Sequence, residues 1–347
     1  MASVDVTVRG GGIFGLSVAW ACARRGARVR LIETGRIGGG CTGGLVGALA
    51  PHAPEAWNPL KQFQFEALKL APGWWQAVAQ AGGKDPGYLR SGRLQPLADE
   101  AAVAAARDRV AAAAQFWGDF ADWQVVPATG AAWEPVSPSG WLVRDTLTAR
   151  LSPRGAAAAL EAALRAHGAE IVLGEGEEAG TVVHATGLAG LNELSAAFGR
   201  KLGAGVKGQA LRLRFDARDQ PQVFAAGTFA VPHADGTVAI GSTAENTWTT
   251  DGPDEQLDAV LARAVAMMPV LAGAEVLERW AGVRPRAKTR GPVLGAWPGR
   301  AGHFIANGGF KIGFGVAPKV GEVLADLVLD GRETGIPEAM RIEALLA

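Results

Sequence analysis

Residues 4–33 constrain the fold of this chain more than any other segment. A β-branched run, Val4–Val8, leads into the glycine sequence Gly10-Gly11-Gly12-Ile13-Phe14-Gly15. The small-residue segment Leu16–Arg25 is typical of a helix, and the apolar run Val29–Ile32 is typical of a strand that ends at Glu33. This order of strand, G-x-G-x-x-G, helix, strand and acid predicts a βαβ unit that binds a dinucleotide.

Each glycine of the motif has a separate physical task. Gly10 permits the tight turn from strand to helix, Gly12 lets the backbone approach a pyrophosphate, and Gly15 lets the helix pack closely on the strand. The first N–H groups of the helix then face the phosphates, and the helix dipole favours their charge. A carboxylate at Glu33 accepts hydrogen bonds from the adenosine ribose and disfavours a 2′-phosphate there.

Composition excludes several classes of protein. The 347 residues are enough for two domains with sizeable cores. Lys plus Arg and Asp plus Glu number 34 each, so we expect no overall positive field for nucleic acid. The two cysteines, Cys22 and Cys41, are too few for a disulfide framework or a four-cysteine metal site. No apolar run is long enough to span a membrane, and no cleavable leader precedes the first strand, which predicts a cytoplasmic protein. The sequence leaves the oligomeric state open.

The rest of the chain alternates between helical and strand patterns. A glycine-rich loop at 36–54 suits close approach to a flat or phosphorylated ligand. Residues 74–145 are read as helix-rich with tryptophans in the core, and residues 207–243 as antiparallel strands with a hairpin at Ala234–Gly236. Further strands are expected at 170–173 and 181–187, and helices at Asn58–Ala71, Asp99–Ala114, Pro153–His167, Asp254–Met268 and Gly313–Leu329. The pattern predicts two interleaved domains.

Four blocks of the sequence resemble the D-amino acid oxidase (DAO) family of FAD-dependent amine oxidoreductases, and within it the glycine oxidases. They are the GGGIFG unit with its acid, CTGGLVGALAPHA at 41–53, VKGQALRL with FAVPHADGTVAIGST at 206–243, and WAGVRPRAKTRGPVLG with NGGFKIGFGVAPKVG at 280–321. The resemblance implies an α/β fold of glutathione-reductase type. In it a Rossmann-like FAD-binding domain (1–80, 146–203 and 288–347) is interleaved with an antiparallel-sheet substrate domain (81–145 and 204–287).

The resemblance also implies which residues contact FAD. The motif would hold the pyrophosphate, Glu33 the ribose, and the 309–313 segment the isoalloxazine ring. The implied cofactor residues are Gly10, Gly12, Ile13, Phe14, Gly15, Glu33, Thr34, Cys41, Thr42, Gly47, Ala48, Leu49, Gly187, Gly309, Phe310, Lys311, Ile312 and Gly313. Because no cysteine lies in 285–295, where some relatives attach the flavin, we expect FAD to be bound non-covalently.

At the substrate, the family pattern implies a carboxylate clamp at Arg284, with Lys311 and Phe229 as further catalytic-site residues. The chain departs from the glycine oxidases here. Phe224 and Phe229 replace tyrosines, Lys311 replaces an arginine, Ala48 replaces a methionine, and the segment 174–180 replaces a longer hairpin. The expected pocket is therefore more apolar than glycine requires.

The implied reaction is oxidation of the C–N bond of a small amino acid or N-alkyl amino acid to an imine and then a keto acid, with O₂ as electron acceptor. Two alternatives stay open: a dehydrogenase that passes electrons to a quinone or carrier, and a flavin-binding protein with a degenerate pocket and a non-catalytic role. Of the histidines, His184 is expected to be structural, and His52 could border the pocket.

Overall fold

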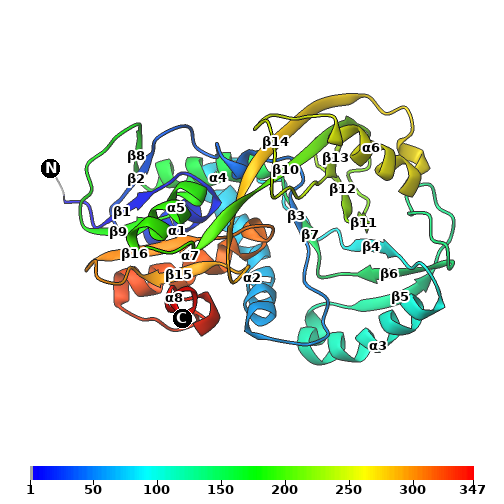
Figure 1. Ribbon diagram of the computed structural model, residues 1–347, viewed down its shortest axis with the longest axis horizontal. Helices are drawn as coiled ribbons and strands as arrows, with labels where there is room; N and C mark the ends of the chain where they lie inside the picture. Colours follow the sequence, from blue (N-terminus) through cyan, green and yellow to red (C-terminus); the bar gives the residue numbers. More distant parts are fainter. Residues whose placement is uncertain (1–2) are drawn as a thin grey trace.

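The computed structural model describes residues 3–347, which form two large sheets and a small two-stranded one (Figure 1). The six-stranded sheet has the order β15 (Val293–Ala296), β16 (His303–Asn307), β9 (Thr181–His184), β1 (Val6–Arg9), β2 (Val29–Glu33) and β8 (Glu170–Leu173). All its pairings are parallel except that of β15 with β16. The chain thus builds the parallel sheet from segments at its start, its middle and its end.

Four helices pack against one another beside this sheet: α1 (Ile13–Ala23), α2 (Pro59–Gly82), α4 (Pro153–Ala166) and α7 (Gly313–Asp330). Every residue of α1 is buried, which explains its uniformly small and apolar sequence. A Cβ at Gly321 of α7 would lie 2.7 Å from the carbonyl oxygen of Ser17, so the two helices are in close contact. Helix α5 (Gly187–Ala197) contacts two long strands, β10 (Gly203–Arg214) and β14 (Val276–Ala287).

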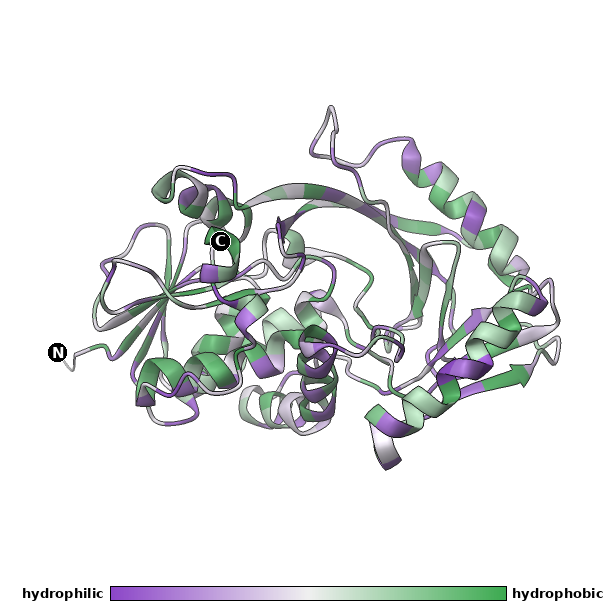
Figure 2. Cartoon of the chain, turned by 60° about the horizontal axis from the view of Figure 1, so that its bottom comes forward, coloured by the Kyte–Doolittle hydropathy of each residue, from purple (hydrophilic) through white to green (hydrophobic). Residues whose placement is uncertain are grey.

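The eight-stranded sheet has the order β14 (Val276–Ala287), β10 (Gly203–Arg214), β13 (Thr237–Gly241), β12 (Thr228–Pro232), β11 (Gln222–Ala225), β4 (Arg93–Pro96), β6 (Trp141–Asp145) and β5 (Trp123–Pro127). Only the β11–β4 pairing is parallel. Figure 2 shows that the strands of this sheet curve strongly, with α6 (Gln256–Met267) outside the curve. Leu257 and Val260 of α6 pack with Leu211 and Leu213, which lie on the outer face of β10.

The remaining elements are short, apart from α3 (Glu100–Trp117), which packs on β5. A two-stranded ladder joins β3 (Ala48–Leu49) to β7 (Ala149–Arg150), and the 3₁₀ turns are η1 (Cys41–Gly43), η2 (Gly118–Phe120), η3 (Pro269–Leu271) and η4 (Glu338–Met340), with α8 (Glu343–Leu346) at the end. No helix in residues 3–347 has the length and apolarity that crossing a membrane requires.

The expected mixed α/β fold is confirmed, with two corrections. The helix expected to end at Ala71 continues through Pro72 to Gly82, where Gly83 caps it in the left-handed conformation. Trp74, Trp75 and Val78 are buried by this extension, and their burial outweighs the roughly 3 kcal/mol that an interior proline costs. Residues 74–145, expected to be helix-rich, also contain β4, β5 and β6, which complete the large sheet.

The tryptophans of this region are core residues, as expected. Trp74, Trp75, Trp117, Trp123 and Trp133 are all buried, and Trp141 is half-buried. Cys22 is also fully buried, and this burial raises the pKa of its thiol to about 12. Cys22 is therefore a small residue of the core.

Candidate active site

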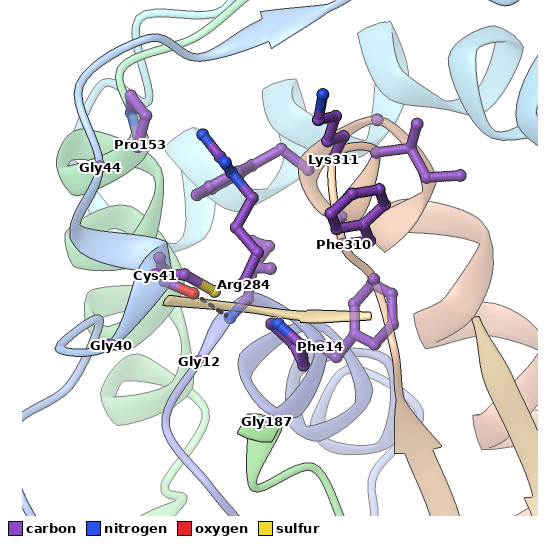
Figure 3. Close-up of a pocket in the computed structure, with 18 of the residues that line it drawn as sticks. Gly12, Phe14, Gly40, Cys41, Gly44, Pro153, Gly187, Arg284, Phe310 and Lys311 are labelled. Atoms are coloured by element: carbon purple, nitrogen blue, oxygen red, sulfur yellow. Dashed lines mark hydrogen bonds between the residues drawn. The ribbon is translucent and has the colours of Figure 1, made fainter. Parts of the chain in front are cut away.

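A cavity of about 980 Å³ lies between the two sheets, at the upper end of the size range of ligand sites. Its lining includes the N-terminal ends of α1 and α7, the loop that precedes β3, and the inner face of the eight-stranded sheet. Figure 3 shows Arg284 reaching between the loop that carries Cys41 and the segment that carries Phe310 and Lys311. The cavity therefore joins the dinucleotide motif to the residues expected at the substrate.

The three motif glycines differ in what they face. Gly10 has φ 104°, and a Cβ there would lie 2.4 Å from the carbonyl oxygen of Ala185. A Cβ at Gly15 would lie 1.9 Å from the carbonyl oxygen of Gly10. Gly12 lines the cavity, and its nearest neighbour would be the Thr42 hydroxyl at 3.3 Å. Gly10 and Gly15 thus permit close packing within the protein, whereas Gly12 leaves room for a ligand.

The α1 N-terminus offers hydrogen-bond donors to that ligand. The N–H of Ile13 donates to the Thr42 hydroxyl at 3.0 Å, while the N–H groups of Gly12 and Phe14 have no partner within residues 3–347. The Glu33 carboxylate accepts from the N–H groups of Gly11 at 2.6 Å and Gly35 at 2.7 Å, and it lines the cavity beside the motif. Free donors at a helix N-terminus beside a positioned carboxylate fit a pyrophosphate and its ribose.

The opposite wall is formed by the segment that begins α7. Phe310 has a left-handed backbone with φ 42°, and its N–H donates to the carbonyl of Pro285 at 3.2 Å. The N–H of Ile312 donates to the carbonyl of Gly309 at 3.0 Å, whereas those of Lys311 and Gly313 have no partner in the part of the chain described. A Cβ at Gly309 would lie 2.9 Å from the Phe14 ring, so the two helix N-termini meet at this cavity.

Arg284 is a half-buried cation that extends from β14 into the cavity. Its Nη1 donates to the carbonyl of Thr243 at 3.1 Å, and its Nη2 donates to the Ser242 hydroxyl at 2.8 Å. The guanidinium lies against Gly208 of β10, where a Cβ would be 2.0 Å from both terminal nitrogens. Burial lowers the pKa of Arg284, and it forms no ion pair with a carboxylate of residues 3–347. A half-buried cation held only by neutral groups is suited to bind an anion.

Lys311 adds a second positive charge on the same wall. Its Nζ lies 5.7 Å from the centre of the Phe310 ring, and the Arg286 guanidinium is also 5.7 Å from that centre. Partial burial, followed by repulsion from Arg284 and Arg286, lowers the pKa of Lys311. The cavity is therefore strongly positive where the substrate carboxylate is expected.

Phe224 and Phe229 form an apolar part of the wall on the large sheet. They are register partners in β11 and β12, and their ring centres are 4.4 Å apart. Both line the cavity together with Ala48. This side of the cavity therefore offers apolar contact without the hydroxyl groups that tyrosines would supply.

The structure brings the residues named from the sequence together, with one exception. Gly15 does not line the cavity, because it lies where α1 packs on the turn at Gly10. The residues named from the sequence that line the cavity are Gly10, Gly12, Ile13, Phe14, Glu33, Thr34, Cys41, Thr42, Gly47, Ala48, Leu49, Gly187, Phe229, Arg284, Gly309, Phe310, Lys311, Ile312 and Gly313.

Neither histidine considered from the sequence lines the cavity. His184 is buried in β9, its Nε2 lies 2.9 Å from Nδ1 of His303, and burial lowers its pKa to about 4. His52 is exposed, and its Nδ1 lies 2.6 Å from Oε1 of Gln64. The structural interpretation of His184 fits this placement, and His52 does not border the pocket.

Sequence reasoning missed several residues that line the cavity. Ser242 lies in a block that carries the family resemblance, but its contact with Arg284 depends on the pairing of distant strands. Arg93, Gln95 and Trp123 come from β4 and β5, where no motif marks them. Only the sheet order brings these side chains to the cavity.

Comparison with known proteins gives a consistent result. A family model described as DAO, FAD dependent oxidoreductase, matches residues 5–327. A glycine oxidase of Pseudomonas aeruginosa is 30% identical over 360 residues, covering 97% of this chain and 98% of the relative. One of Geobacillus kaustophilus is 27% identical over 362 residues, covering 93% and 92%. The crystal structure of glycine oxidase from Geobacillus kaustophilus has a TM-score of 0.86 at 24% identity, covering 97% of each chain.

Proposed function

This chain belongs to the DAO family of FAD-dependent oxidoreductases, and we propose that it oxidises the C–N bond of a small amino acid or N-alkyl amino acid with O₂ as electron acceptor. It is an FAD-dependent enzyme that acts on amino groups. The observation that carries the proposal is Arg284, a half-buried cation without a carboxylate partner in residues 3–347, in the cavity that fits FAD. We also propose a cytoplasmic location.

The segments proposed to bind FAD and those proposed to bind the substrate correspond to the two large sheets. We propose that segments 1–80, 146–203 and 288–347 hold FAD, and that 81–145 and 204–287 contribute the substrate side. The strands of the six-stranded sheet lie in the first set, and those of the eight-stranded sheet lie in the second apart from the first residue of β10. Bound FAD supplies the acceptor for the hydride that leaves the α-carbon.

The side chains of this chain bind and orient the substrate. Arg284 binds the carboxylate through two parallel N–H groups, and the Phe224–Phe229 pair contacts the rest of the molecule. The charges of Arg284 and Lys311 favour the neutral amine over the ammonium form. A hydride then leaves the α-carbon, a proton leaves the nitrogen, and water hydrolyses the imino acid to a keto acid and ammonia, or to a keto acid and an amine where the nitrogen carries an alkyl group.

The test is reduction of the holoenzyme by amino acids without oxygen. A panel of D-, L- and N-alkyl amino acids is mixed with the protein under argon, and the visible absorbance of the flavin is followed. We expect bleaching by at least one member, and hydrogen peroxide once air is admitted. Bleaching without peroxide would favour the dehydrogenase alternative, and no bleaching by any amino acid would contradict the proposed substrate class.

The bound FAD is expected to be released intact by denaturation. The purified protein should be yellow, and acid or heat should leave all flavin in the supernatant, because no cysteine lies in 285–295 and desolvation raises the pKa of the half-buried Cys41 thiol. Chromatography of the supernatant against FAD and FMN standards measures this. Flavin that stays with the precipitated chain would show a covalent bond.

Glycine is expected to be a poor substrate. Because Phe224, Phe229 and Ala48 line the cavity without hydroxyl groups, kcat/KM for glycine should lie about tenfold or more below that for the best apolar or N-alkyl amino acid. Steady-state assays over a panel measure the ratio. The Phe229→Tyr variant restores a hydroxyl and should shift the ratio towards glycine. A highest kcat/KM for glycine in the unmodified protein would contradict this expectation.

A further inference from the structure

Arg93 is another arginine that lines the cavity, and its strand, β4, lies several strands away from β14, which carries Arg284, in the large sheet. Its Nε donates to Oδ2 of Asp145 at 2.8 Å, and its side chain is 6% exposed. Its two terminal nitrogens donate no hydrogen bond to residues 3–347, although the residue lines the cavity. Arginine–carboxylate pairs are frequently bidentate, whereas here only Nε contacts the carboxylate and both terminal nitrogens are left for another partner.

Strand register places Arg93 and Arg284 on the same face of the sheet. Arg93 is paired with Gln222 of β11, and Phe224, two residues further, is on the same face and is paired with Phe229 of β12. Phe229 is paired with Gly241, which is the partner of Ala210 in β10, and Ala210 is the partner of Trp280 in β14. Trp280 and Arg284 share a face because four residues separate them along β14.

This face therefore runs from one cation to another across an apolar middle. Arg284 extends from β14 to Gly208 of the neighbouring strand β10. Further along the strand order come the Phe224–Phe229 pair on β11 and β12 and then Arg93 on β4. Beside Arg93, the side-chain nitrogen of Gln95 is buried without a partner in the described chain, and Gln95 also lines the cavity. The Arg93 end thus carries several N–H donors that the described residues leave unused.

The charges of this part of the cavity do not balance. Arg284 and Lys311 have no carboxylate partner in residues 3–347, and Arg93 is balanced only by Asp145 on the neighbouring strand. If one substrate carboxylate binds Arg284, an excess of positive charge remains, and the two terminal nitrogens of Arg93 still have no partner among the described residues. An anionic group at the far end of the ligand would satisfy both.

We propose that Arg93 binds a second carboxylate, so that the preferred substrates are amino acids whose side chain or N-substituent ends in a carboxylate beyond an apolar spacer. The statement about substrates rests on the proposed function, whereas the binding of two carboxylates does not. The apolar spacer would lie against Phe224 and Phe229, and the amine would lie near the carboxylate that Arg284 binds. Arg93 is thereby a specificity-determining residue.

The experiment uses unreactive ligands, so that binding is measured apart from oxidation. Linear dicarboxylates from succinate to azelate are titrated into the FAD holoenzyme, and the change in flavin absorbance gives each Kd. Monocarboxylates of equal chain length are the reference. We expect the best dicarboxylate to bind at least about tenfold more tightly than its monocarboxylate. No advantage for a dicarboxylate of any length overturns the proposal.

Two variants then test the residue. Arg93→Lys keeps a cation for buried Asp145 but removes the fork, and the double variant Arg93→Met, Asp145→Leu replaces the pair by apolar side chains. Both should lose most of the dicarboxylate advantage. Arg144→Lys is the matched control, because Arg144 is exposed on the opposite face of β6 and should keep the advantage. An advantage that survives Arg93→Lys overturns the assignment to Arg93.

Activity separates this proposal from the proposed function. If the holoenzyme oxidises amino acids, 2-aminoadipate and 2-aminopimelate should exceed norleucine in kcat/KM, and Arg93→Lys should reduce that excess. If no amino acid bleaches the flavin but the dicarboxylate advantage depends on Arg93, the proposed function fails and the binding site stands. If amino acids are oxidised without such an advantage, the second-carboxylate site fails alone.

Discussion

Replacement of Arg284 by alanine is expected to lower kcat/KM for a carboxylate substrate by roughly 30- to several-thousand-fold, because truncating one partner of a desolvated charge pair costs about 2–5 kcal/mol. The FAD content should not change, since the contacts of Arg284 are with Ser242, Thr243 and Gly208 on the large sheet. Steady-state kinetics on holoenzyme of measured flavin content gives the ratio.

The size of the loss should depend on the shape of the cation. Arg284→Lys keeps the charge but loses the two parallel donors, so its kcat/KM should fall between those of the alanine variant and the unmodified protein. Lys311→Ala should cost less than Arg284→Ala, because a flexible point charge binds a carboxylate more weakly. Both comparisons are made at the same flavin occupancy, so that lost cofactor is not mistaken for lost substrate binding.

A matched arginine on the same strand provides the control. Arg279 lies on β14 on the opposite face, exposed and paired with Asp258, and Arg279→Ala should leave kcat/KM within error of the unmodified value. A near-normal kcat/KM in the Arg284→Ala variant would contradict the proposal that Arg284 binds the substrate carboxylate. The substrate would then be sought among amines that carry no carboxylate.

Gly12→Val is expected to give a folded protein that binds no FAD. The φ of Gly12 is −79°, which any residue adopts, and its nearest neighbour would be the Thr42 hydroxyl at 3.3 Å. The new side chain therefore requires the Thr42 side chain to move by only a few tenths of an ångström, but the cavity at the α1 N-terminus does not leave room for a pyrophosphate beside it. Circular dichroism measures folding, and titration with FAD measures binding.

Gly15→Ala provides the contrasting variant. A Cβ there would lie 1.9 Å from the carbonyl oxygen of Gly10, so this change should lower the unfolding temperature of the apoprotein, whereas Gly12→Val should not. Retained FAD binding in Gly12→Val, or equal unfolding temperatures of the two variants in the apo form, would contradict the different tasks assigned to these glycines.

The sequence predicted those parts of the fold that depend on residues close to one another in the chain. Gly10, Gly12, Gly15 and Glu33 act within one βαβ unit, so their spacing alone indicates their tasks. The hairpin at Ala234–Gly236 and the start of α7 at Gly313 depend on turn and helix-end residues that are also close in the chain. Arg284 was found because its surrounding block resembles a known family, not because its own type indicates a clamp.

Tertiary structure alone decided the rest, because the deciding contacts join residues far apart in the chain. Pro72 lies inside α2 only because Trp74 and Trp75 are buried beyond it. The fork of Arg93 is free because Asp145, 52 residues away, takes only its Nε, and it faces the cavity of Arg284 because β4 pairs with β11. Sequence patterns therefore predicted where a dinucleotide binds, whereas strand pairing determined which cations share the cavity.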